Sequence, residues 1–139
     1  MKVDYAVRAL LDLAEGSGTK QSGDIAERWS IPAPYLDQLL TALRKAGLVT
    51  SVRGPQGGHM LARPASRITV NDVFEALEGP LAPIECLEDN ARCSFSRTCA
   101  IQDVWSEVQT TVARLLTAVT IADLARTQAD MSQPAMYYI

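Results

Sequence analysis

Apolar residues recur at spacings of three and four along three short stretches near the N-terminus, the pattern of amphipathic helices. The first covers residues 2–15, and the second follows Ser22, a favourable N-cap residue. The third covers residues 33–46 and is closed by Gly47. Because Ile31-Pro32 separates two short helices by a tight turn, the pattern predicts a helix-turn-helix.

Two short runs of strand-forming residues follow, at residues 48–52 and 59–62, joined by the turn sequence RGPQGG. This predicts a two-stranded wing. Gly54 and Gly57 in its tip would let the backbone approach another surface closely, and Arg53 at its base could enter a narrow minor groove. Taken alone the hairpin could be an ordinary turn, but the preceding helices favour a wing.

The C-terminal half contains the longest helical pattern, at residues 100–126, after a short helix expected at residues 71–77. The long pattern has a near-heptad apolar seam at Ile101, Val104, Trp105, Val108, Val112, Leu115, Leu116, Val119 and Ala122. A small domain cannot cover such a helix, so we expect it to pair with its own copy; the alternative is a helix packed on its own core.

These patterns predict a mainly α fold: a winged helix-turn-helix DNA-binding domain with a small two-stranded wing, plus a long C-terminal dimerisation helix. We expect the DNA-binding domain at residues 1–79, a cysteine loop at 80–100, the dimerisation helix at 101–126 and a flexible tail at 127–139.

Charge is distributed unevenly along the chain, whose net charge is −3. There is no acidic residue between Asp37 and Asp72, and that interval carries Arg44, Lys45, Arg53, Arg63 and Arg67. A locally basic face on an acidic protein can follow a phosphate backbone, although a charge run can also be a solvated surface.

The chain has 47% apolar residues, enough for a core, and no apolar run of membrane-spanning length. Its N-terminal stretch has an amphipathic period with internal acids, unlike a signal peptide. We therefore expect a cytoplasmic protein without a membrane partner, in a compartment where thiols stay reduced.

All three cysteines, Cys86, Cys93 and Cys99, lie in one segment, CLEDNARCSFSRTC. Clustered cysteines in a reducing compartment indicate metal binding or redox sensing. Structural zinc uses closer cysteine pairs and four protein ligands, so a cluster with three thiolates and a different fourth ligand fits this spacing better. A thiol redox switch and small packing residues are the alternatives.

Five segments together resemble one family: KVDYAVRALLDLA, IPAPYLDQLLTALRKAGLV, SVRGPQGGHMLARP, ITVNDVFEALEG and CLEDNARCSFSRTCAIQDVW. They resemble the winged helix-turn-helix iron–sulfur regulators of the IscR/NsrR-like type, over about residues 2–125. The resemblance implies a homodimer that binds double-stranded DNA at a palindromic promoter site. It also implies a 2Fe–2S or 4Fe–4S cluster held by Cys86, Cys93 and Cys99.

The fourth cluster ligand is where this chain departs from the pattern. The first cysteine gap is six residues rather than the typical five, and Gln102 stands where the 2Fe–2S type has a histidine. In the nitric-oxide-sensing type, an aspartate before the tyrosine of the first helix reaches the cluster across the dimer. The matching residue is Asp4, before Tyr5, so the resemblance implies Asp4 of the partner subunit as fourth ligand. The alternative is a helix N-terminal acid.

The resemblance also implies the DNA contacts. Tyr35 would contact phosphate, while Asp37 and Gln38 would face base edges, since aspartate can accept from cytosine and glutamine can pair with adenine. Asp37 could instead act only against wrong sites. Arg53 would enter the minor groove. The predicted interface is completed by Arg44, Gly54 and Gly57.

The chain is therefore expected to be a DNA-binding transcriptional regulator, a repressor, controlled by an iron–sulfur cluster. A cysteine-thiol redox-sensing regulator without a cluster is the alternative. We expect no enzyme, since no paired acid–base constellation or nucleophile motif is present in the sequence. The sequence leaves open whether the signal is iron, nitric oxide, peroxide or redox state.

Overall fold

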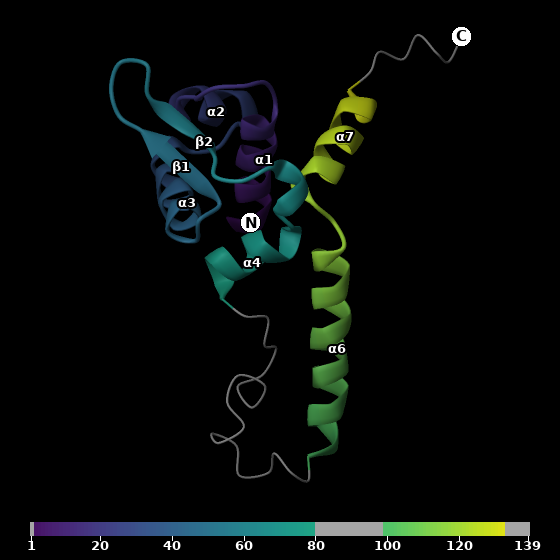
Figure 1. The fold of residues 1–139 in the computed structure, drawn as a ribbon. Coiled ribbons are helices and arrows are strands. Elements are labelled where there is room, and N and C mark those ends of the chain that lie inside the picture. Colours follow the sequence, from purple (N-terminus) through teal and green to yellow (C-terminus); the bar gives the residue numbers. More distant parts are fainter. Residues whose placement is uncertain (1, 80–98, 133–139) are drawn as a thin grey trace, which may run out of the picture.

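The computed structural model describes residues 2–79 and 99–132, which are mostly helical (Figure 1). The elements in chain order are α1 (Lys2–Ala14), α2 (Ser22–Trp29), α3 (Ala33–Lys45), β1 (Val49–Val52), β2 (Gly58–Leu61), the 3-10 helix η1 (Ala65–Arg67), α4 (Val70–Glu78), α6 (Ala100–Thr117) and α7 (Ile121–Met131). Strands β1 and β2 form an antiparallel pair. The predicted mainly α class with a small two-stranded wing is confirmed.

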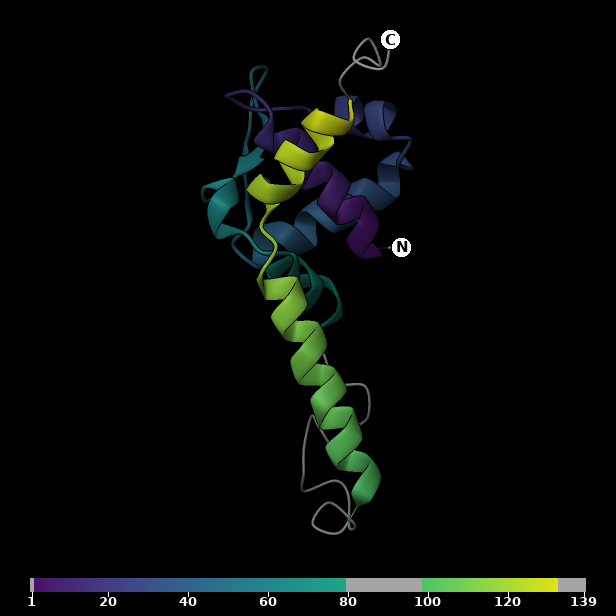
Figure 2. The same ribbon diagram turned by 90° about the vertical axis from the view of Figure 1, so that its right-hand side faces the viewer.

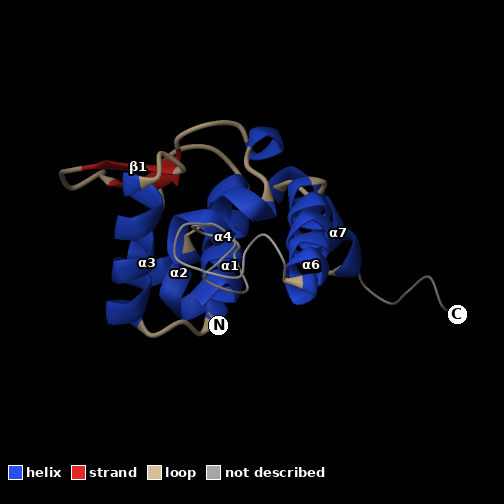
Figure 3. Ribbon diagram, turned by 90° about the horizontal axis from the view of Figure 1, so that it is seen from below, coloured by secondary structure: helices blue, strands red, loops and turns tan. Residues whose placement is uncertain are grey.

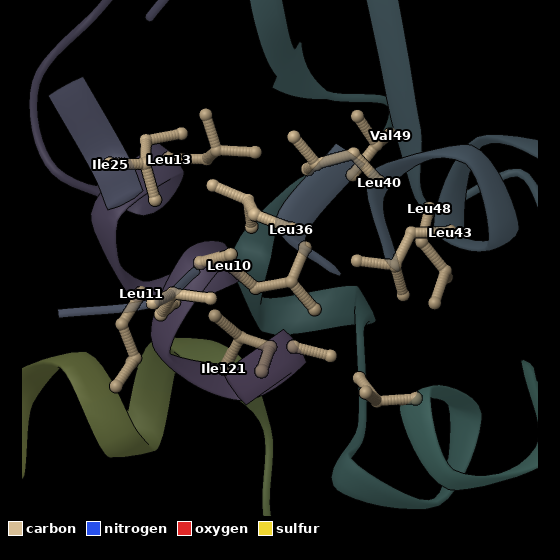
Figure 4. Close-up of a cluster of buried hydrophobic side chains, with 14 of the residues drawn as sticks. Leu10, Leu11, Leu13, Ile25, Leu36, Leu40, Leu43, Leu48, Val49 and Ile121 are labelled. Atoms are coloured by element: carbon tan, nitrogen blue, oxygen red, sulfur yellow. The ribbon is translucent and has the colours of Figure 1, made fainter. Parts of the chain in front are cut away.

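Helix α1 lies at the centre of the N-terminal body, and α2, α3, α4, α7 and β2 pack against it. Its Leu10 is fully buried and lies among side chains from α2, α3 and α7, including Ile25, Leu36 and Ile121 (Figure 4). Burial of each such side chain contributes about 1.5–3 kcal/mol. Seen from below, α3 and the sheet lie on one side of α1, with α6 and α7 on the other (Figure 3).

The turn between α2 and α3 is closed by main-chain geometry. The backbone of Ser30 adopts the left-handed αL conformation, with φ 54°, and the N–H of Ile31 donates to the Ala26 carbonyl at 2.9 Å. Ile31 is buried and Pro32 is the N-cap of α3, so the chain turns sharply here. Two helices joined in this way confirm the predicted helix-turn-helix pair.

The N-cap prediction for Ser22 is wrong. Ser22 is the first residue of α2, and the N-cap is Gln21, which has extended geometry and makes no side-chain cap. The Gln21 amide donates instead to the Gly57 carbonyl in the wing. The N-cap position is therefore used to attach the wing to the body of the protein.

The expected single helix at residues 100–126 is two helices. Helix α6 ends at Thr117 and α7 begins at Ile121, because Thr120 is the N-cap of α7. The Thr120 hydroxyl accepts from the Asp123 N–H, and the Asp123 carboxylate accepts from the Thr120 N–H, both at 3.0 Å. A threonine followed three residues later by an acid is a sequence signature of such a cap, so the break could have been recognised.

The break returns the chain to the N-terminal body. The Val70 N–H donates to the Val119 carbonyl at 2.9 Å, and the Ile121 N–H donates to the Ile68 carbonyl at 2.8 Å. α7 then packs against α1 and buries Ile121 completely. The prediction of a tail from residue 127 is wrong up to Met131, where α7 ends; residues 133–139 lie outside the described residues.

Helix α6 packs against α4 but extends away from the body for most of its length (Figure 2). Several apolar residues of its predicted seam are exposed: Ile101, Val104, Trp105, Val108 and Leu115. The described part of the chain therefore leaves this seam uncovered. Within residues 2–79 and 99–132, no helix combines the length and apolar character needed to cross a membrane.

The cap at Thr120 gives a direct test of the break. We expect Thr120→Ala to lower the free energy of unfolding by about 1 kcal/mol, because the Asp123 N–H in the first turn of α7 loses its side-chain acceptor. Urea unfolding at fixed protomer concentration measures it. The control is Thr127→Ala on the same helix, whose hydroxyl only donates to the Asp123 carbonyl. Equal midpoints for the two variants would contradict the expectation.

Candidate nucleic-acid interface

Helix α3 divides cleanly into a buried and an exposed face. It buries Leu36, Leu39, Leu40 and Leu43 toward the core, at helical spacing. The predicted base-reading residues Asp37 and Gln38, and the basic residues Arg44 and Lys45, are therefore exposed. A helix anchored by one leucine stripe can present this polar face to the major groove.

Tyr35 is half-buried at the N-terminal end of α3. Its ring packs edge-on against the Tyr5 ring of α1, with centroids 5.7 Å apart and an interplanar angle of 81°. The Arg8 guanidinium lies 5.8 Å from the Tyr5 ring centroid and pairs with Asp4 at 3.1 Å. Tyr35 and Asp4 thus belong to one surface group that ties the start of α3 to α1.

The wing tip depends on its glycines in two different ways. Gly54 is exposed at φ 113°, a conformation that favours glycine, and its carbonyl accepts from the Gly57 N–H at 2.9 Å to close the turn. Gly57 is buried, and a Cβ there would lie 2.1 Å from the Val52 carbonyl oxygen. Gly57 thus meets a packing requirement inside the wing, and its predicted backbone approach to DNA stays a prediction.

A third extended segment, residues 19–21, attaches the wing to the body and was missed by sequence reasoning. Lys20 and His59 exchange both main-chain hydrogen bonds, at 2.9 and 2.8 Å. The Thr19 hydroxyl donates to the Gln56 carbonyl at 3.1 Å. An extended segment this short has no periodic signal in the sequence, so only the tertiary structure reveals this contact.

His59 connects the sheet to α3 electrostatically. Its Nδ1 lies 2.8 Å from the Ser51 hydroxyl on β1. Burial lowers the pKa of His59; the Asp37 carboxylate opposes this shift and the Arg44 guanidinium reinforces it. The imidazole is thus part of the surface on which α3 and the wing meet.

The acid-free interval of the sequence forms one region of the structure. It covers the second half of α3, both strands and η1, and Arg44, Lys45, Arg53, Arg63 and Arg67 are all exposed there. The hairpin projects beside α3 (Figure 1). Exposed cations around a protruding hairpin and an outward helix face make a surface suited to a phosphate backbone.

The predicted cluster ligands are only partly described. Cys86 and Cys93 lie outside the described residues, while Cys99 is half-buried at the N-cap position of α6, where its side chain makes no capping bond. The start of α6 lies at the far end of the molecule from α1, which carries Asp4 (Figures 1 and 2). Over the described ranges, no three His, Cys, Asp or Glu side chains gather as a metal site.

A protein-family model described as "Rrf2: Iron-dependent Transcriptional regulator" matches residues 1–127. The chain belongs to the Rrf2 family. It is 44% identical over 124 residues to protein rrf2 of Nitratidesulfovibrio vulgaris, covering 88% of this chain and 83% of that protein.

Solved structures that are related to this chain in sequence share its fold, among them structures of IscR and CymR. T. potens IscR matches with a TM-score of 0.76 and 39% identity, over 99% of this chain and 94% of that chain. CymR, titled the global cysteine regulator of B. subtilis, matches with a TM-score of 0.74 and 33% identity, over 91% of this chain and 95% of that chain.

The predicted resemblance to IscR-like regulators is confirmed, and this Rrf2-family chain is a transcriptional regulator of a DNA-binding family. The expectation that it is not an enzyme is also confirmed, because its relatives are named as transcriptional regulators. The roles of individual residues in DNA and metal binding stay predictions.

Gly57 and Gly23 form a matched pair for testing the wing. We expect Gly57→Ala to lower the free energy of unfolding by roughly 1–3 kcal/mol and to weaken DNA binding, because the added methyl group must displace the Val52 carbonyl. Gly23→Ala, in α2 with open space around it, is expected to leave DNA affinity unchanged. Urea unfolding and DNA titration measure both; a Gly57→Ala protein with native stability would contradict the packing requirement.

The lowered pKa of His59 predicts a pH dependence of stability. Above the ordinary histidine pKa of about 6.5, the imidazole is neutral in both the folded and the unfolded protein, so the contribution of His59 to the free energy of unfolding is fully present. As the pH falls below this value, the unfolded chain binds a proton before the folded protein does. The free energy of unfolding therefore decreases until the pH has passed the lowered pKa of His59 in the folded protein. We expect wild type to lose more stability than His59→Gln on acidification through this window. Parallel pH profiles would refute it.

Proposed function

We propose that this chain is a homodimeric Rrf2-family repressor that binds a palindromic promoter site through α3 and the wing. Control is exerted by an iron–sulfur cluster held by Cys86, Cys93 and Cys99, with the partner subunit's Asp4 as fourth ligand. The observation that carries the DNA-binding part is the exposed polar face of α3 beside a hairpin that is surrounded by exposed cations.

DNA reading is assigned to α3 and the wing. With its leucine face buried, α3 can enter the major groove and bring Asp37 and Gln38 to base edges, where they can accept from cytosine and pair with adenine. Arg53 is exposed directly after β1, in the wing, where its guanidinium can enter the adjacent minor groove. Arg44 and Lys45 at the last turn of α3 are placed to contact phosphate.

Dimerisation is assigned to α6. Ile101 is 52% and Leu115 63% exposed, an unusual state for large apolar residues at seam positions. The same helix has an open, mainly apolar groove lined by Val104, Val108 and Val112. The side chains of a second α6 would fill this groove. A twofold pair of readers matches a palindromic site with half-sites about 34 Å apart.

Cluster control is assigned to the segment that starts α6. Cys99 is the N-cap residue of α6, so a bond between its sulfur and a metal would constrain the orientation of the dimer helix. When bound, a cluster would supply a redox-sensitive and nitric-oxide-sensitive link between the cysteine segment and this helix. The family description names iron dependence, which supports iron as the metal.

Asp4 suits a ligand donated across a dimer. Its carboxylate is exposed, and its ion pair with Arg8 lies on the surface, where such pairs contribute only about 0–1 kcal/mol. The carboxylate can therefore exchange Arg8 for iron at small cost. Within one subunit α1 and the start of α6 lie at different ends of the molecule, which supports the partner subunit as the source of this ligand (Figure 1).

A cysteine-thiol regulator without a cluster is the second candidate. The similar structure of CymR is titled a global cysteine regulator, and one of the similar Staphylococcus aureus CymR structures is titled an oxidized form. In this case Cys99 would act as a reactive thiol with one of the other cysteines. The two candidates share the same DNA-binding surface and differ in the chemistry of one segment.

Anaerobic preparation distinguishes them. We expect a brown protein with visible absorption and near-stoichiometric iron and sulfide, lost in Cys99→Ala, and DNA affinity that changes when the cluster is removed. Asp4→Ala should alter the visible spectrum, whereas Arg8→Gln should not, because it breaks the same ion pair but keeps the carboxylate. Colourless protein with a reversible disulfide would support the second candidate, and identical spectra for Asp4→Ala and wild type would exclude Asp4 as a ligand.

A further inference from the structure

A buried carboxylate lies at the C-terminal end of α1, outside the residues assigned so far. Asp12 is 3% exposed and is surrounded by core residues on α1. It has two cationic partners: the Arg28 Nη1 at 2.5 Å and the Lys20 Nζ at 3.3 Å. The Lys20 ammonium also donates to the Asp12 carbonyl oxygen. A charge this deeply buried is retained only where its partners hold it in place.

The two cations connect Asp12 to different parts of the protein. Arg28 lies on α2 and also binds Glu15 at 2.6 Å, so it holds α2 against α1. Lys20 lies in the extended segment that pairs with the wing, and its side chain is 27% exposed. Only Lys20 therefore connects the buried carboxylate to the DNA-facing hairpin.

Lys20 holds the wing through its main chain. Its N–H and C=O both pair with His59, while the neighbouring Thr19 and Gln21 side chains donate to Gln56 and Gly57. The approach is close, since a Cβ at Gly58 would lie 2.6 Å from the Lys20 carbonyl oxygen. A hairpin of two four-residue strands is marginal alone, so its direction depends on such an attachment.

We propose that Lys20 is a positioning residue for the wing, whose ammonium, seated on Asp12, sets the angle at which the hairpin carries Arg53 toward DNA. The inference rests on the proposed DNA-binding function of the wing. Val52, the residue before Arg53, pairs with Gly58, so a displacement of the residues that meet Lys20 moves the base of Arg53 as well.

The test compares Lys20→Met with Glu15→Gln in the full-length protein. Lys20→Met keeps the aliphatic stem and leaves Asp12 paired with Arg28, so the fold is preserved. Glu15→Gln removes a carboxylate from the same ion cluster without touching the Lys20 contact. The probe is a short fluorescent duplex selected from a random pool by the wild-type protein. We expect Lys20→Met to bind about tenfold more weakly, the scale of one lost groove contact, and Glu15→Gln to bind as wild type.

A double-mutant cycle with Arg53→Ala shows whether Lys20 acts through the wing. If it does, Lys20→Met adds no further loss of affinity once Arg53 is absent, and Lys20→Arg restores binding in the wild-type background. Equal losses in both backgrounds would mean that Lys20 acts only as one more positive charge, which overturns the inference. In that outcome an affinity loss from Arg53→Ala alone still supports the proposed DNA contact.

Hydrogen exchange at the His59 amide gives a readout that does not involve DNA. This amide donates to the Lys20 carbonyl, so we expect faster exchange in Lys20→Met and unchanged exchange in Glu15→Gln. Unchanged exchange in Lys20→Met would show that the ammonium does not hold the wing, whatever the DNA measurements give. A thermal midpoint equal in the two variants confirms that neither effect comes from global unfolding.

Discussion

Burial of α1 on several sides at once is the constraint on which the rest of the structure depends. Helices α2, α3, α4 and α7 and strand β2 all pack against it. Its small residues Ala6 and Ala9 let neighbours approach, and Leu10 fills the space between them. Because one helix contacts all of these elements, α3, the wing and the returning C-terminal helix α7 are held in fixed relative positions.

Apolar burial decides which elements meet, but it has little directional preference. Orientation comes from polar contacts at the edges of the core. The αL turn at Ser30 sets α3 relative to α2, and the segment at residues 19–21 holds the hairpin by main-chain pairs and by the seat of Lys20 on Asp12. Hydrogen bonds and ion pairs of this kind work only at defined angles, so they determine where the polar face of α3 and Arg53 point.

Both ends of the cysteine segment are connected to this body. On one side α4 packs on α1 and α3; on the other, α6 leads to residues 119–121, whose main chain pairs with residues 68–70. The N-terminal caps at Thr69 and Thr120 lie side by side as an isolated bridge. A change in the segment between α4 and α6 would therefore act on elements that contact α1. Under the proposed function, this is a physical route from the proposed cysteine centre to the proposed DNA-binding surface.

The sequence by itself determined the helices of the N-terminal body, the hairpin and the outward residues of α3, because helical spacing and a glycine-rich turn are local signals. It also predicted the exposed seam of α6, since no other apolar surface was left to cover it. Family membership followed from short motifs such as RGPQGG, which require no knowledge of contacts. The residues assigned to cluster binding were read from spacing and resemblance, and Cys86 and Cys93 lie outside the described residues.

Only the tertiary structure decided how the wing is attached and where the C-terminal helix breaks. Gln21 meets Gly57 and Lys20 meets His59 more than thirty residues along the chain, and no local pattern encodes these contacts. The apolar seam continues through residues 118–120, so periodicity alone favoured one helix; the Thr120 cap and the main-chain pairs to residues 68–70 stabilise two. Periodicity reports which face of a segment is apolar, whereas long-range hydrogen bonds decide what that face meets.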